Sequence, residues 1–541
     1  MPRWLLYIFL PTIVLIYGCK SDSQTHKNIF YWNIATGFTS MDPAFARIQA
    51  NIWVTHQLFN GLIQLDDSLN IKPCIAKSWE ISKDAKTYTF HLRNDVLFHP
   101  HKAFSTTDMR KVTAQDFVYS FKRLMSGKTA SPGSWIFNDK IDTANNFSNA
   151  FRALNDSTFQ ITLTKPFSPL LHLLGLEYCA VVPEEVVELY GKDFRANPVG
   201  TGPFKMKKYY DGEKLLIERN EEYFELDSAG NRLPYIDGAE ITFMTSKQSE
   251  FFSFAKGDLS VLTGLDKSFK DNILTRNGDV KPPYSEKYNF EVSPYLNTEY
   301  LGILVDEKLL GNSPLRLKKV RQAMNYAIDR AKMMRYLRND IGDPGIYGFV
   351  PPSLIENDKK YYDYNPEKAR NLLQEAGFKP NEPIRGLKLA TTEIYLDMAI
   401  FIQKQLESVG IFIEIDNAPP GTLSEWKAQS KTQFFRGSWV ADYADAENYL
   451  SVFYSKNWSP DGPNYFHYKN PEFDRLYEQV LLLTDEKQKQ LSYAKMQDIL
   501  MEDAPVIVLF YDEVIRLKQK NVKGLAPNAI NLINLKGVRL E

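Results

Sequence analysis

Side chains that could support covalent or metal chemistry are sparse in this sequence. Its 541 residues include seven histidines and three cysteines. His99 and His101 are the best candidates for metal ligands, but Pro100 separates them and no third ligand lies nearby, which favours a solvated loop. Cys74 and Cys179 lie outside any Cys-x-x-Cys or Cys/His cluster, and they could form a disulfide bond only if their Cα atoms approach within about 7 Å. We therefore predict no metal site and no cofactor.

Glycine-rich and catalytic motifs give no enzymatic assignment. Gly127-Lys128-Thr129 resembles the end of a phosphate-binding loop, but it lacks the first glycine and follows a predicted helix, so it predicts a surface loop. Gly200-Thr201-Gly202 lacks the third glycine of a dinucleotide-binding fingerprint and is followed by Pro203. Neither a Gly-x-Ser-x-Gly elbow nor a His-Glu-x-x-His helix occurs. The 66 acidic residues offer too many carboxylate pairs to select one. We predict that the protein is not an enzyme and has no catalytic residues.

The N-terminal residues predict the compartment. Arg3 precedes a mostly apolar stretch of fourteen residues, 4–17, which at about 1.5 Å per residue is too short for the ~30 Å hydrocarbon core of a membrane. Gly18 and Cys19 follow, and the chain then turns polar, as in a bacterial lipobox. This pattern predicts a signal peptide over residues 1–18, lipidation at Cys19 and a lipidated tether over residues 19–28. The product would be an exported cell-envelope lipoprotein. The alternative is an ordinary cleaved signal peptide with an incidental cysteine.

Composition narrows the class of the mature chain. The sequence has 65 basic and 66 acidic residues, a formal charge of −1, which gives no electrostatic reason to expect a nucleic-acid partner. Hydrophobic residues at 44% and charged residues at 24% are typical of globular proteins and exclude a disordered or fibrous chain. Its length predicts about three or four domain-sized units. Aromatic residues at 13% exceed what core packing requires, so some could line a large recognition cleft.

Short strands and amphipathic helices are predicted to alternate along the chain. Alternating apolar residues predict half-buried strands over residues 86–92 and 158–163. Thr113 and Asp116 form a capping-box pattern at the start of a helix. Apolar residues at helical spacing predict one long helix over residues 317–338.

The C-terminal half contains a strand–helix–strand pattern. A helix over residues 396–409 lies between apolar stretches at 387–390 and 411–415, which predicts a βαβ unit and therefore an α/β lobe. Asn365-Pro366 is typical of a helix start. A buried strand is expected at 505–510.

Eight segments, in order, carry a resemblance that covers the chain from about Ile29 to Glu541. They are residues 41–43 (Met-Asp-Pro), 58–62 (Leu-Phe-Asn-Gly-Leu), 75–80, 87–93, 112–120, 198–204 (Pro-Val-Gly-Thr-Gly-Pro-Phe), 320–330 and 364–370. In this order the sequence resembles the family 5 extracellular solute-binding proteins of ABC importers, the group that binds oligopeptides and dipeptides.

The resemblance implies an α/β, two-lobed periplasmic-binding-protein-like fold (class II, large type with an extra subdomain) with a hinged cleft between the lobes. Lobe I is expected over residues 29–65, 190–288 and 508–541, with an inserted subdomain over 66–189. Lobe II is expected over 289–507. Ligand must contact both lobes to drive closure.

The resemblance also implies site residues in the segment Arg436-Gly437-Ser438-Trp439-Val440-Ala441-Asp442-Tyr443. In peptide-binding relatives the Asp of Trp-x-x-Asp pairs with the ligand α-ammonium, which matches Asp442, and a basic residue three positions before the Trp can assist the C-terminal carboxylate, which matches Arg436. Trp439, Tyr443 and Tyr465 are candidate pocket walls, with core packing as the alternative for each. The alternative for Asp442 is a cap on a helix that begins near Ala444.

The resulting hypothesis is a monomeric, lipid-anchored receptor that captures short peptides and delivers them to the permease and ATPase of an ABC importer. The alternatives are an oligosaccharide or a metal or haem chelate as ligand, and, more distantly, an exported hydrolase. After Asp42-Pro43 the chain lacks the Glu-Gly element that some oligopeptide binders use against the ligand backbone, so the length of the ligand is left open.

Overall fold

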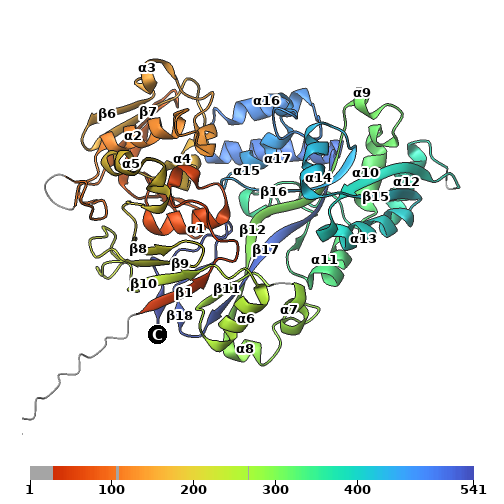
Figure 1. The fold of residues 1–541 in the computed structure, drawn as a ribbon. Coiled ribbons are helices and arrows are strands. Elements are labelled where there is room, and N and C mark those ends of the chain that lie inside the picture. Colours follow the sequence, from red (N-terminus) through yellow and green to blue (C-terminus); the bar gives the residue numbers. More distant parts are fainter. Residues whose placement is uncertain (1–27, 105–108, 266, 380) are drawn as a thin grey trace, which may run out of the picture.

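The computed structural model describes residues 28–104, 109–265, 267–379 and 381–541, and its fold is mixed α/β with several sheets (Figure 1). The predicted signal peptide, the lipidation site Cys19 and the tether up to residue 27 lie outside the described residues. Among the helices in the described part of the chain, none has the length and hydrophobicity needed to cross a bilayer.

The N-terminal strand joins a four-stranded sheet made from distant parts of the chain. β1 (Ile29–Asn33) pairs in parallel with β10 (Gly238–Thr242), which is followed in the sheet by β9 (Lys214–Arg219) and β8 (Phe204–Tyr210). Helix α1 (Gln49–Leu58) contacts β8. The first strand of the chain therefore pairs with a strand that lies about 200 residues later in the sequence.

A second sheet lies within the predicted inserted subdomain. Its order is β4 (Ala76–Ile81), β5 (Thr87–Leu92), β7 (Thr158–Thr162) and β6 (Phe151–Asn155), all antiparallel. The strands predicted over 86–92 and 158–163 are confirmed. Helix α2 (Ala114–Met125) packs on β6 and β7, and it begins with the predicted capping box of Thr113 and Asp116.

The C-terminal half forms a seven-stranded sheet. The sheet order is β11 (Val261–Thr263), β17 (Val506–Gln519), β12 (Tyr288–Ile303), β16 (Phe434–Val440), β14 (Ile384–Thr391) and β15 (Ile411–Asn417), with β13 (Asp343–Pro344) beside β17. β14 and β15 are parallel and are connected through α13 (Leu396–Glu407), which confirms the βαβ unit. β17 covers residues 506–510 of the strand expected at 505–510 and continues to Gln519.

The long strands β12 and β17 pair along most of their length and run diagonally through the centre of the molecule in Figure 1. Their register shifts between Pro294 and Thr298, and again between Glu299 and Tyr300. Such irregularities bend a strand locally. The strip formed by β12 and β17 is therefore bent where it runs from β11 toward β16.

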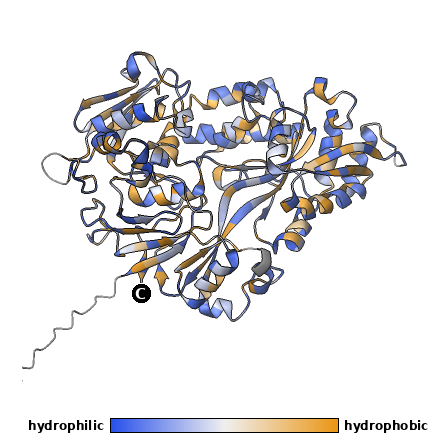
Figure 2. Cartoon of the chain, viewed as in Figure 1, coloured by the Kyte–Doolittle hydropathy of each residue, from blue (hydrophilic) through white to orange (hydrophobic). Residues whose placement is uncertain are grey.

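Both faces of the seven-stranded sheet are buried. Val506 and Val508 belong to one hydrophobic cluster, whereas Ile507 and Leu509 belong to another. This alternation follows from the two-residue period of a strand, and helices on both faces complete the two clusters. Figure 2 shows hydrophobic residues alternating with hydrophilic ones along these helices. The helices of the C-terminal half are α9 (Glu307–Leu310), α10 (Lys318–Tyr326), α11 (Arg330–Arg338), α12 (Pro366–Glu375), α13, α14 (Pro420–Ala428), α15 (Ala446–Leu450), α16 (Pro471–Val480) and α17 (Glu486–Asp503).

The single helix predicted over residues 317–338 is wrong, because the structure has two helices there. α10 ends at Tyr326, and α11 begins at Arg330 after its N-cap Asp329, whose side chain accepts a hydrogen bond from Lys332 N. The apolar stripe continues through the break, since Ala327 and Ile328 are buried too. Hydrophobic spacing therefore did not reveal the local capping. The helix start at Asn365-Pro366 is confirmed by α12.

The remaining helices connect the first two sheets and surround β11. They are α3 (Ala144–Phe147), α4 (Leu170–Leu174), α5 (Glu184–Tyr190), α6 (Lys247–Lys256), α7 (Lys267–Ile273) and α8 (Tyr284–Lys287). Short strands β2 (Ile63–Leu65) with β3 (Ile71–Pro73), and β18 (Val522–Lys523) with β19 (Arg539–Leu540), form two separate two-stranded sheets.

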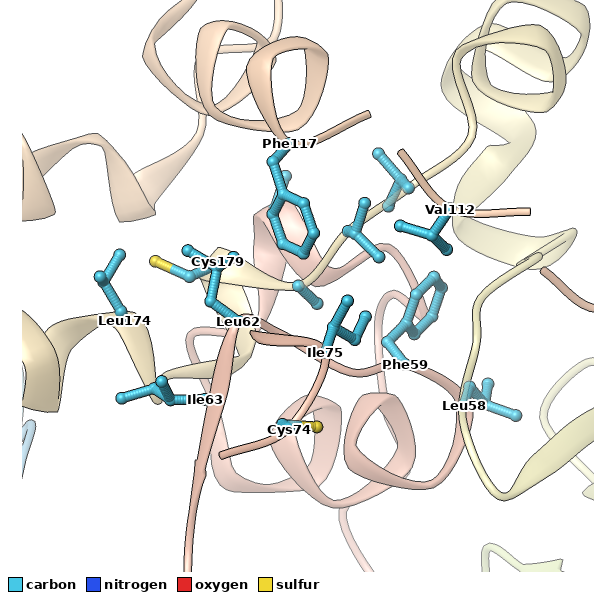
Figure 3. Packing of buried hydrophobic residues seen from close by; sticks show 14 of the residues in the cluster. Leu58, Phe59, Leu62, Ile63, Cys74, Ile75, Val112, Phe117, Leu174 and Cys179 are labelled. Atoms are coloured by element: carbon cyan, nitrogen blue, oxygen red, sulfur yellow. The ribbon is translucent and has the colours of Figure 1, made fainter. Parts of the chain in front are cut away.

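Cys74 and Cys179 are free thiols, so the disulfide bond considered from the sequence is not formed. Figure 3 shows both among apolar side chains of one core cluster, on different segments and with their sulfur atoms not facing each other. Burial raises the pKa of the Cys74 thiol to about 12 and also raises that of Cys179. Both residues serve as small apolar core residues.

The Gly200-Thr201-Gly202 segment is packed against the end of α1. His99 is buried beside it: Gly200 N donates to His99 Nδ1 at 3.3 Å, and His99 Nε2 lies 3.0 Å from Gly202 O. Burial lowers the pKa of His99 to about 4, so its ring is neutral. His101 contacts the Tyr190 hydroxyl instead. The two histidines that were weighed as metal ligands therefore have separate structural partners.

We expect Gly202→Ala to destabilise the protein by about 1–3 kcal/mol, because the new methyl would lie 2.4 Å from the Leu58 carbonyl carbon. Gly127→Ala is the matched control, since nothing lies within 4 Å of its added methyl. Urea unfolding of both variants measures the difference. Equal midpoints for the two variants would show that the segment can move away from α1.

Candidate functional site

A cavity of about 780 Å³ lies where the N-terminal half meets the middle of β12 and the end of β16. It is within the range of about 300–1,000 Å³ typical of small-ligand sites. Four stretches of chain line it: residues 46–65 around α1, residues 174–180, residues 440–444 after β16, and residues 530–536 near the C-terminus. Tyr295 and Leu296 of β12 add to the wall. Segments from both halves of the molecule therefore face the same space.

The cavity wall is partly aromatic. Trp135, Tyr178, Tyr223, Tyr295 and Tyr443 all line it. The rings of Trp135 and Tyr443 stack with centroids 6.2 Å apart, which joins the predicted inserted subdomain to the segment after β16. Such walls suit a ligand with apolar groups and leave polar recognition to a few positions.

Most charged groups that line the cavity are already paired. His56 Nδ1 lies 2.8 Å from Glu177 Oε1, and Lys536 Nζ lies 2.5 Å from Glu225 Oε2. Asp442 and Arg47 line the cavity too, and neither has an ion-pair partner among the described residues. One carboxylate and one guanidinium therefore remain available to a bound molecule.

The backbone at Asp442 is fixed while its carboxylate is exposed to the cavity. Ala441 N donates to Leu296 O at 2.8 Å, and Asp442 N donates to Asn448 Oδ1 at 3.3 Å. Asp445, rather than Asp442, caps α15 by accepting from Glu447 N. The capping role that the sequence left open for Asp442 thus belongs to its neighbour.

Desolvation by the surrounding protein raises the pKa of Asp442, and a hydrogen bond with Asn448 opposes the shift. A carboxyl group whose pKa is higher in the folded than in the unfolded state binds more protons when folded, so its contribution to stability falls as the pH rises. The charged form of Asp442 is therefore a local cost in the empty protein, which a cationic group of a ligand would offset.

We expect Asp442→Asn to stabilise the empty protein at pH 7, because the variant carries no desolvated charge there. The advantage should disappear as the pH falls toward 3.8, the ordinary pKa of the group. Thermal unfolding across pH 3–8 measures it. Asp227→Asn is the opposite control: hydrogen bonds from Tyr235 and Asn231 lower the pKa of Asp227, so that variant should lose stability at neutral pH. A lower melting temperature for both variants would contradict this reading of Asp442.

Arg436 does not line the cavity. It lies on β16, and its Nε and Nη2 contact both carboxylate oxygens of Glu299 on β12 at 2.5–3.0 Å. Its guanidinium carbon lies 3.4 Å from the centroid of the Tyr395 ring. The side chain of Arg436 is 14% exposed and that of Glu299 only 4%. Arg436 therefore takes part in a buried ion pair, and its contact with a ligand carboxylate stays a prediction.

The three predicted aromatic residues have different surroundings. Tyr443 lines the cavity, but it is buried and its hydroxyl donates to Glu447. Trp439 Nε1 donates to Asn448 Oδ1 at 2.9 Å, and Trp439 packs against a hydrophobic core cluster. Tyr465 contacts Lys427. Of the predicted ligand-binding residues, the structure brings only Asp442 and Tyr443 to the cavity.

Sequence reasoning missed Arg47, Trp135 and Tyr178. The only available signal was the segment after Asp42-Pro43, where an expected Glu-Gly element is absent and Arg47 is present. In the part of the chain that the structure describes, no cluster of three His, Cys, Asp or Glu residues is arranged to hold a metal ion.

A family model, curated relatives and solved structures all relate this chain to extracellular solute-binding proteins. Residues 70–461 match the bacterial extracellular solute-binding proteins, family 5 Middle. The chain is 27% identical over 519 residues to the periplasmic oligopeptide-binding protein OppA of Salmonella typhimurium, covering 92% of this chain and 90% of that protein. It is 26% identical over 502 residues to the dipeptide-binding protein of Escherichia coli, with 90% and 89% covered. The unliganded open form of the murein tripeptide-binding protein MppA superposes with a TM-score of 0.81 at 24% identity, covering 95% of this chain and 98% of that one.

Proposed function

The chain belongs to family 5 of the bacterial extracellular solute-binding proteins, and from that premise we propose that it captures short peptides and delivers them to the membrane permease of an ABC importer. The observation that carries the peptide assignment is Asp442, a carboxylate without an ion-pair partner among the described residues, at the wall of a cavity of about 780 Å³. Binding is the whole of the proposed activity, and no bond is made or broken.

A peptide suits this cavity on physical grounds. Its α-ammonium would be costly to bury unpaired, by several kcal/mol, and Asp442 supplies the opposite charge. Aromatic walls such as Trp135 and Tyr178 can contact different side chains without selecting one. A neutral sugar would use the aromatic walls but would leave the carboxylate unpaired, so an oligosaccharide fits less well.

Ligand capture is proposed to act through closure of the two lobes predicted from the sequence, lobe I with its inserted subdomain and lobe II over residues 289–507. A ligand shifts such an equilibrium only by contacting both lobes. The cavity meets this requirement, since α1 and residues 440–444 both line it. The bent pair of β12 and β17 connects the region of β11 to that of β16 and is the candidate hinge.

The site of action is proposed to be the cell envelope. The relatives are periplasmic or extracellular binding proteins, which implies export. The lipobox-like sequence before Cys19 supports acylation of that residue and attachment of a monomer to a membrane through the tether. The permease and ATPase subunits of the importer are its expected partners.

Mass spectrometry tests the proposed ligand class. The chain from Lys20 onward would be purified and measured under native conditions and again after acid release. Intact peptides of a few residues each are the expected result. A hexose ladder, a metal chelate or steady cleavage of added peptides would contradict the proposal.

A further inference from the structure

Arg47 is a cavity-lining cation whose backbone is held tightly while its guanidinium has no partner. It lies between the 3₁₀ turn Pro43–Phe45 and α1. Arg47 N donates to Phe45 O at 2.8 Å, and Asn51 Nδ2 donates to the same carbonyl at 2.9 Å. Asp42 caps the turn and is itself paired with Arg123 at 2.5 Å. The turn that presents Arg47 is thus fixed from both sides.

The guanidinium of Arg47 is exposed, and among the described residues it has neither an ion-pair nor a hydrogen-bond partner. The other cations at the cavity wall differ, because His56 and Lys536 are paired with Glu177 and Glu225. An arginine carries five N–H donors in a planar fork that matches a carboxylate. Arg47 therefore keeps an unused carboxylate-binding group in the cavity.

Arg47 and Asp442 line the same cavity, and Tyr178 lines it as well. Arg47 precedes α1 and Asp442 follows β16, so the two charges reach this one space from different halves of the chain. They nevertheless do not pair with each other. A molecule bearing both an ammonium and a carboxylate could contact Asp442 and Arg47 together.

We propose that Arg47 binds a carboxylate of the peptide whose ammonium is bound by Asp442, and that it therefore selects acidic or very short ligands. This inference rests on the proposed function. The carboxylate can be the C-terminus of a peptide of two or three residues, or an acidic side chain near the N-terminus of a longer one. In either case Arg47 fills the role that the sequence assigned to Arg436.

Calorimetric titration of the chain from Lys20 onward tests the proposal with three probes: trialanine, trialanine amide and Ala-Asp-Ala amide. The unsubstituted protein should bind at least one carboxylate-bearing probe about 10- to 100-fold more tightly than trialanine amide, as expected for a charge-assisted hydrogen-bonded pair. Arg47→Gln should reduce that ratio to about one. Arg47→Lys should retain part of it, because the charge remains without the fork.

Arg152→Gln, an exposed arginine on β6 away from the cavity, is the matched control and should leave the ratio unchanged. Loss of the preference for trialanine in Arg47→Gln assigns the C-terminal carboxylate to Arg47, and loss of the preference for Ala-Asp-Ala amide assigns the acidic side chain. A preference that survives in Arg47→Gln, or one that is absent from the unsubstituted protein, would overturn the role of Arg47 alone. If the unsubstituted protein bound none of the three, the proposed function itself would fail.

Discussion

Asp442→Asn is expected to weaken the binding of peptides with a free N-terminus by about 2–5 kcal/mol, while N-acetylated peptides lose little. The asparagine keeps the size of the side chain and its position after β16 but cannot neutralise an ammonium group. Because Asp442 has no ion-pair partner among the described residues, no neighbouring carboxylate at that position takes over the lost charge. Titration of matched free and acetylated peptides against both proteins gives the two differences.

Asp363→Asn is a suitable control for this measurement, since Asp363 is exposed and does not line the cavity. It should bind both peptides as the unsubstituted protein does. An equal loss for free and acetylated peptides in Asp442→Asn would remove Asp442 from ammonium recognition and point to a general distortion of the wall.

The second large effect concerns stability. Arg436→Gln is expected to destabilise the protein by about 3–5 kcal/mol, because it leaves the Glu299 carboxylate buried without its partner. Burial already raises the pKa of Glu299 despite the opposing charge of Arg436. Without Arg436 the folded state holds a proton on Glu299 more strongly than the unfolded state does, so the loss should shrink as the pH falls.

Urea unfolding at several pH values measures this loss. Arg475→Gln breaks an exposed arginine–glutamate pair, with Arg475 51% and Glu472 55% exposed, and should cost less than about 1 kcal/mol. The double variant Glu299→Gln/Arg436→Gln should recover much of the stability, since no buried charge remains. If Arg436→Gln were as mild as Arg475→Gln, the pair would be solvated, and Arg436 would again be available for a ligand.

Local pattern accounts for the elements that could be predicted. The strand β5, the capping box of α2 and the βαβ unit of α13 each follow from side chains within about thirty residues. The break between α10 and α11 was missed because one capping aspartate outweighs an uninterrupted apolar stripe. The full length of β17 was missed because its later half pairs with β11 and β12, which are distant in sequence.

The site residues follow the same rule: those within a local motif could be predicted, and those that depend on contacts between distant segments could not. Asp442 was predicted because the surrounding motif implies its role by resemblance, and the structure places it at the cavity wall and assigns helix capping to Asp445. Arg436 was assigned to the ligand by the same resemblance, and its ion pair with Glu299, 137 residues earlier in the chain, could not be predicted from spacing. Arg47 was missed for the converse reason, since its importance depends on the cavity that three other chain segments enclose with it.

The late position of β17 in the chain has a consequence for biogenesis. This strand lies between β11 and β12 in the sheet, and Gln57 of α1 contacts the backbone of Ile533 and Leu535. Neither half of the molecule can close its core until the ribosome has passed these residues. At roughly 5–20 residues per second, synthesis leaves the chain incomplete for about half a minute to two minutes. Contacts of such long range also form slowly. A nascent chain with this topology cannot complete its seven-stranded sheet until residues 506–519 are made, and a chain truncated before residue 506 is expected to aggregate rather than fold.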